Sequence, residues 1–278
     1  MPGSSLQNPP KKGGPHKAMI HHYLGPVEPW FQLTAALVLA WAMMFYPMLA
    51  IWTNERYKKW PMHRYVFWFA GVIVAGASLV GPLADAAHTS FSAHMTGHLL
   101  LGMLAPLLLL HGKPLTLVMR GLPTKPARKL SRVMNSRFIA LASHPVSTSF
   151  LNFGGLFILY RTDLFVWMHQ STWVYALVHI HILLAGYVFT WSILYTDLTT
   201  HRHSFRLRAA VLIVAFAGHK VLAKSLYTMP PAGVTTSDGE MGALIMYYGG
   251  DVIDLVVIVL FCYSWYKATA PGRIARAV

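Results

Sequence analysis

Two histidines lie four residues apart in an otherwise apolar stretch. His94 and His98 occur in the run Ser-Phe-Ser-Ala-His-Met-Thr-Gly-His-Leu-Leu-Leu, and helix positions i and i+4 share a face. An imidazole placed in hydrocarbon loses its hydration and needs a partner, a metal or a water-filled cavity in return. The pair is therefore the first candidate for a site that binds a metal or a ligand.

The composition predicts an integral membrane protein. Of the 278 residues, 55% are hydrophobic and only 12% are charged, and the mean hydropathy is +0.46. A spanning helix needs about 20 mainly apolar residues. The sequence contains seven such segments, whose Leu, Ala and Met content favours helices over the strands of a barrel: 30–53, 65–84, 91–111, 146–168, 173–196, 207–229 and 242–266.

The net charge of +14 indicates topology when the positions of the cations are considered. Most of the 23 Lys and Arg residues fall in alternate connections, on one predicted side of the membrane, and in the C-terminal tail. The positive-inside rule then places the N-terminus outside and the C-terminus in the cytoplasm. Because this distribution accounts for the basic charge, we expect no nucleic-acid partner.

These patterns predict an all-α fold, a polytopic membrane protein built as one bundle of seven transmembrane helices. We expect a flexible extracytoplasmic arm over residues 1–29, a seven-helix membrane domain over 30–266 and a short basic cytoplasmic tail over 267–278. Pro106 removes a backbone hydrogen bond within the third span and should kink it.

With this orientation, the expected third, fifth, sixth and seventh spans bring nitrogen and sulfur donors to the outer half of the membrane. The candidate metal ligands are His94, His98, His179, Met95, Met241, Met246, His88 and Met229. Each also has a structural alternative, since methionines fill gaps in apolar bundles and His88, in a loop, is open to solvation.

The donor types favour copper. Imidazole nitrogen and thioether sulfur together suit Cu(I), whereas zinc sites usually recruit Cys or carboxylate and calcium needs several oxygens. Cys262 is the single cysteine, so soft-metal chemistry in this chain depends on His and Met. The sequence has no nucleophile elbow, no Gly-rich phosphate loop and no His-Glu-x-x-His motif, and we expect no enzymatic turnover.

Several motifs resemble those of the CtaG-type cytochrome c oxidase assembly factors. The likeness extends over residues 30–266, and its most specific part lies in the third span. The motifs are Ser-Phe-Ser-Ala-His-Met-Thr-Gly-His at 90–98, Gly-Lys-Pro-Leu-Thr-Leu at 112–117, Arg-Gly-Leu-Pro at 120–123, His-Pro at 144–145 and the helix around His179. The resemblance implies a multi-pass protein of the bacterial plasma membrane that helps to mature a haem-copper oxidase, with His94, His98 and His179 as the membrane histidines of the family.

The leading hypothesis is an assembly factor that binds copper, as Cu(I), in the outer half of the membrane. It would help deliver the ion to the CuB centre of the oxidase catalytic subunit. The expected partners are that subunit, the lipid bilayer and an extracytoplasmic copper donor protein. Two alternatives remain open at this point: a haem-binding electron-transfer protein with His98 and His179 as axial ligands, and a copper permease with a continuous path of methionines.

Overall fold

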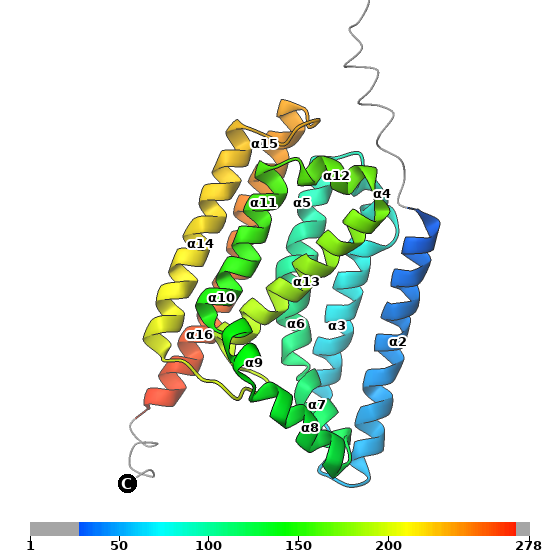
Figure 1. Cartoon of the computed structure of the whole chain (residues 1–278), viewed down its shortest axis with the longest axis vertical. Helices are drawn as coiled ribbons and strands as arrows, with labels where there is room; N and C mark the ends of the chain where they lie inside the picture. Colours follow the sequence, from blue (N-terminus) through cyan, green and yellow to red (C-terminus); the bar gives the residue numbers. More distant parts are fainter. Residues whose placement is uncertain (1–27, 271–278) are drawn as a thin grey trace, which may run out of the picture.

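The structure, a computed structural model, describes residues 28–270, and all regular elements in this range are helical. Six helical stretches are long and apolar enough to cross a membrane, and they run side by side as one bundle (Figure 1). They are α2 (Pro29–Asn54), α3 (Met62–Leu79), α5–η1–α6 (Phe91–Leu99, Leu100–Leu104 and Ala105–His111), α13 (Thr172–Leu194), α14 (Phe205–Thr228) and α15–η3–α16 (Thr236–Leu244, Ile245–Gly249 and Gly250–Thr269).

Six of the seven expected spans are thus confirmed as helices of spanning length, while the count of seven and the orientation of the termini stay predictions. The expected fourth span is divided. It comprises α10 (Pro145–Ser149), η2 (Phe150–Gly154) and α11 (Gly155–Arg161), and then α12 (Leu164–Gln170). At the break the hydroxyl of Thr162 donates to the carbonyl of Ile158 at 2.6 Å and accepts from the nitrogen of Leu164 at 3.3 Å. These local bonds replace continuing helical ones.

The outward faces of the bundle are apolar. On α2, Leu37 and Trp41 are each 62% exposed and Met44 is 74% exposed. Water solvates an apolar face of this extent poorly, whereas lipid chains cover it without cost. The structure therefore supports a multi-pass membrane protein. The expected arm lies outside the described residues except for Glu28 and Pro29, where the chain enters α2, and the last residues of the expected tail also lie outside them.

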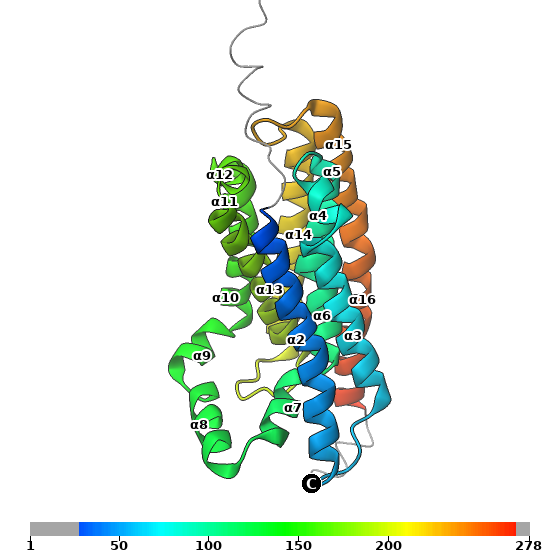
Figure 2. The ribbon, with the colours of Figure 1, turned by 90° about the vertical axis from the view of Figure 1, so that its right-hand side faces the viewer.

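The two ends of the bundle differ. At one end lie α4 (Pro82–Ala87), α12 and α15, and at the other lie α7 (Pro114–Gly121) and the basic helix α8 (Thr124–Met134), followed by α9 (Arg137–Ala142) (Figure 1). Figure 2 shows α8 and α9 standing apart from the packed helices. Arg120 of α7 donates to the carbonyl of Lys58 at 2.6 Å, which fastens this basic end to the connection between α2 and α3.

The predicted kink at Pro106 takes the form of a π-helical segment, η1. Proline has no N–H to donate and its ring clashes with the carbonyl four residues earlier, that of Gly102, so the helix widens at this point. A Cβ added to Gly186 would lie 2.0 Å from this carbonyl oxygen. The glycine therefore lets α13 pack directly against η1, which brings His179 of α13 to the helix that carries His94.

Candidate functional site

The helix that carries His94 and His98 is fixed at its N-terminus. Ser90 caps it by accepting from the nitrogen of Ala93. Asp238 of α15 accepts from the backbone nitrogens of Phe91 and Ser92 at 2.6 and 3.1 Å. A carboxylate at this position satisfies unpaired N–H groups and complements the positive end of the helix dipole. A segment far away in the sequence thus sets the position of the two histidines.

Four histidines gather at the end of the bundle formed by α4, α12 and α15, which is the outer end in the predicted orientation. We name them the outer histidine cluster: His88, His94, His169 and His179. The ring centroid of His94 lies 6.2 Å from that of His169 and 6.3 Å from that of His179. His88 lies 5.6 Å from His169. The structure therefore brings three predicted site residues together and adds His169, which lies in α12.

The hydrogen bonds of the cluster leave nitrogen lone pairs available. Nδ1 of His179 lies 2.8 Å from the carbonyl oxygen of Tyr175. Because a carbonyl only accepts, Nδ1 donates, and Nε2 of the neutral ring keeps its lone pair, an arrangement typical of metal-binding histidines. His88 is 8% exposed, and neither of its ring nitrogens has a hydrogen-bond partner among the described residues.

Burial also keeps the two histidines outside the long helices neutral. The pKa of His88 is lowered from 6.5 to about 4, chiefly because the ring is buried, and His169 adds to the effect. Burial likewise lowers the pKa of His169, although the carbonyls of Phe165 and Ala87 oppose the shift. A neutral imidazole is the form that binds a metal.

His98 belongs to a different group from His94. Its ring lies 6.4 Å from that of His219 on α14. Both rings line a cavity of about 30 Å³ together with Met103 and Asp254. The ring nitrogens of both histidines and both carboxylate oxygens of Asp254 are buried without a hydrogen-bond partner in the described residues. We name these four residues the inner group.

The predicted methionines separate by exposure. Met95 and Met246 are fully buried in one apolar core that also includes Phe91 and Tyr160, both of which pack against His94. Met229 and Met241 are 63% and 54% exposed, so their side chains lie at the surface of the described bundle. Sequence reasoning missed four members of the two groups: Met103, His169, His219 and Asp254.

The spacing of the rings suits ion binding by pairs. Metal–nitrogen bonds of about 2.0 Å place the centroids of two imidazoles that share an ion roughly 5 to 6.5 Å apart. The pairs within the outer histidine cluster fall in this range. In residues 28–270, however, no group of three or more His, Cys, Asp or Glu side chains is arranged to hold a metal ion.

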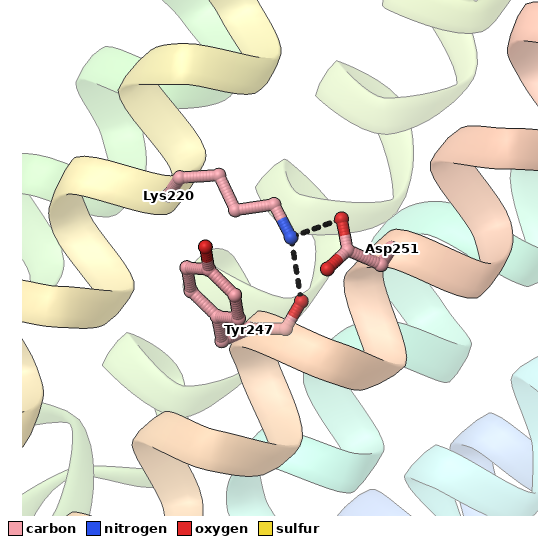
Figure 3. Close-up of polar contacts among 3 residues, drawn as sticks. All are labelled: Lys220, Tyr247 and Asp251. Carbon is pink, nitrogen blue, oxygen red and sulfur yellow. Dashed lines mark hydrogen bonds and ion pairs between the residues drawn. The ribbon is translucent and has the colours of Figure 1, made fainter.

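A partly buried cation lies close to the inner group. Lys220 of α14 forms an ion pair with Asp251 of α16 and donates to the carbonyl oxygen of Tyr247 at 2.8 Å (Figure 3). Its ammonium nitrogen also lies 3.9 Å from the centroid of the Tyr247 ring. Asp251 thus neutralises Lys220, and the pair joins α14 to α16 beside the cavity.

Comparison with known proteins relates the chain to bacterial sequences. It is 28% identical over 231 residues to an uncharacterized protein of Mycobacterium leprae. The matched region covers 76% of this chain and 35% of that protein. It is 30% identical over 235 residues to uncharacterized proteins of Mycobacterium bovis and Mycobacterium tuberculosis, with 77% of this chain and 36% of each relative covered. The chain thus spans about a third of the length of these relatives.

No solved structure matches the chain. The family model described as cytochrome c oxidase caa3 assembly factor (Caa3_CtaG) matches residues 44–268, a range that includes the outer histidine cluster and the inner group. Because this match extends over most of the sequence, the chain belongs to the Caa3_CtaG family of cytochrome c oxidase assembly factors.

Proposed function

We propose that this protein is a copper-handling assembly factor of the bacterial plasma membrane. It receives Cu(I) at the extracytoplasmic side and helps deliver the ion to the CuB centre of a haem-copper oxidase catalytic subunit. The family supports a role in oxidase assembly. We infer the copper cargo from the site, whereas the CuB destination is what the resemblance to the family implies.

The observation that carries the copper proposal is the state of His88. Its ring is buried, both of its nitrogens lack hydrogen-bond partners in the described residues, and it packs against His169. Leaving a buried polar atom unsatisfied costs about 1–3 kcal/mol, and proteins retain such atoms where a ligand completes them. An incoming ion would bind the nitrogen of the neutral His88 ring that carries the lone pair.

Low coordination suits transfer. Cu(I) is stable with few ligands, and imidazole pairs at the observed spacing supply them without a closed cage. An ion held by two exchangeable nitrogens leaves more readily than one held by four. The outer histidine cluster therefore fits a protein that passes copper on better than one that stores it.

The geometry gives less support to the haem alternative. His98 and His179 would have to face each other across a porphyrin, but the ring of His98 is grouped with His219 and that of His179 with Tyr175. The cavity beside His98 measures about 30 Å³, which holds about two water molecules. Absorption spectra of the purified protein test this alternative directly, since bound haem gives a Soret band.

The function is tested in cells that lack the protein and carry either the wild type or a His88→Gln/His94→Gln variant. We expect the variant to reduce the copper content and activity of the purified oxidase severalfold while membranes contain normal amounts of the variant. The matched control is His111→Gln. His111 terminates the same helical stretch at its other end, where its Nδ1 bonds the carbonyl of Leu107 at 2.7 Å.

Equal copper in the oxidase from the double variant and from the wild type would contradict the proposal. Uptake of copper by proteoliposomes that contain only this protein would instead favour the permease alternative.

A further inference from the structure

The inner group places buried polar side chains around one cavity inside the bundle. His98, His219 and Asp254 are 5%, 2% and 4% exposed, come from three separate helical stretches and line one cavity. Six of their nitrogen and oxygen atoms have no hydrogen-bond partner in the described residues. Core packing alone does not explain this concentration of unsatisfied atoms, because each of them costs stability.

Two π-helical segments line this cavity, and a third ends beside His219. Met103 lies in η1 and Phe153 in η2, and both line the cavity. The third segment, η3, ends just before Gly250, where an added Cβ would come within 2.8 Å of the His219 ring. Such segments are uncommon and occur frequently at functional sites. Here they widen three helices at the level of the histidines.

The charges around the cavity are compatible with a bound cation. Lys220 is the nearest basic side chain on α14, but Asp251 and the carbonyl of Tyr247 already engage it (Figure 3). Asp254 is therefore left without a counter-charge of its own. Water in the cavity would supply hydrogen bonds but no charge, so a carboxylate in this low-dielectric interior either takes up a proton or pairs with a cation.

We propose that the inner group is a second Cu(I) site, in which His98, His219 and the thioether of Met103 hold the ion and Asp254 balances its charge. A monovalent ion and one carboxylate give a neutral assembly, which suits the membrane interior better than a divalent ion would. Imidazole and thioether donors exclude sodium and potassium, which prefer oxygen ligands. This inference deepens the proposed function, and it rests on that proposal for the identity of the cargo.

The test counts Cu(I) on the purified full-length protein in lipid nanodiscs, under reducing conditions, with a chromophoric Cu(I) chelator as competitor. We expect two ions per chain for the wild type and one for His219→Gln, which loses only the inner site. His88→Gln/His94→Gln also binds one ion, and His111→Gln binds two. X-ray absorption at the copper edge detects a sulfur neighbour in the wild type that Met103→Leu removes.

The two proposals fail in different ways. If His219→Gln binds as much Cu(I) as the wild type, or if the sulfur signal persists in Met103→Leu, the inner site is overturned while the outer one stands. If the outer double variant binds as much as the wild type and His219→Gln binds less, the inner site is supported and the proposed outer site fails. Thermal unfolding of each variant verifies that it is folded. If His219→Gln does not fold, Met103→Leu tests the inner site instead, because leucine has nearly the same volume as methionine.

Discussion

The hydroxyl of Tyr160 lies 3.1 Å from Nε2 of His94. The ring of the same tyrosine packs edge-on against His98, with their centroids 6.4 Å apart. One buried side chain on α11 therefore contacts a member of the outer histidine cluster and a member of the inner group. His94 and His98 are one helical turn apart, but they face different partners on either side of this tyrosine.

Replacing Tyr160 with phenylalanine tests whether its hydroxyl competes with the ion for His94. The substitution keeps the ring and removes one buried hydrogen bond, which costs about 1 kcal/mol of stability. Because Nε2 of His94 no longer has to exchange this bond for a metal, we expect the outer site to bind Cu(I) severalfold more tightly. Chelator competition measures the affinity, and weaker binding at an unchanged fold would contradict this role.

Asp238 holds the helix of His94 and His98, and Asp238→Asn should loosen it. The carboxylate accepts hydrogen bonds from two backbone nitrogens and from the hydroxyls of Ser90 and Ser92. An amide presents a single acceptor oxygen and no charge, so we expect a loss of about 1–2 kcal/mol. Copper affinity of the outer site should fall as well.

The control for this prediction is Glu240→Gln, which removes the same charge from the same short helix. Glu240 makes no side-chain hydrogen bond to α5 in the described structure. Hydrogen exchange of the amides at the start of α5 measures the loosening. Equal exchange in Asp238→Asn and in the wild type would show that the cap is not needed.

Much of the fold follows from hydropathy, because spanning helices need long apolar runs. Six expected spans correspond to helices in the structure. The fourth expected span is not one continuous helix, although the run 146–168 is apolar on average. A short polar stretch around Thr162 makes local hydrogen bonds that end α11. Average hydropathy does not detect such a competition between side chain and backbone.

The site was predictable in part. The i, i+4 spacing identified His94 and His98, but a helical repeat does not reveal which partner each ring meets. Met103 is five residues after His98, and positions five residues apart lie on different faces of an α-helix. The π-helical turn of η1, where bonds run from i to i+5, brings these positions closer together. A sequence pattern based on a regular helix therefore overlooks this methionine.

Two aspartates on α16, three residues apart, should respond to substitution with opposite signs. Asp254→Asn removes a buried carboxylate that has no partner in residues 28–270, so the metal-free protein should melt at a higher temperature while the inner site loses Cu(I). Asp251→Asn leaves Lys220 without its ion-pair partner and should destabilise the protein by about 1–3 kcal/mol. Thermal unfolding in nanodiscs measures both, and destabilisation by Asp254→Asn would argue against an unpartnered charge.

The metal-free protein should lose stability as the pH falls from 7 towards 4. Burial lowers the pKa of His88 from 6.5 to about 4. Between these values the unfolded chain takes up a proton at His88 and the folded protein does not, so the free energy of unfolding decreases with falling pH and levels off below about 4. His88→Gln should reduce this dependence, with part of it remaining because burial also lowers the pKa of His169, whereas His63→Gln, at an exposed position, serves as the control substitution. Melting temperatures measured across this range decide the matter, since an equal slope in the wild type and in His88→Gln would mean that another group takes up the proton.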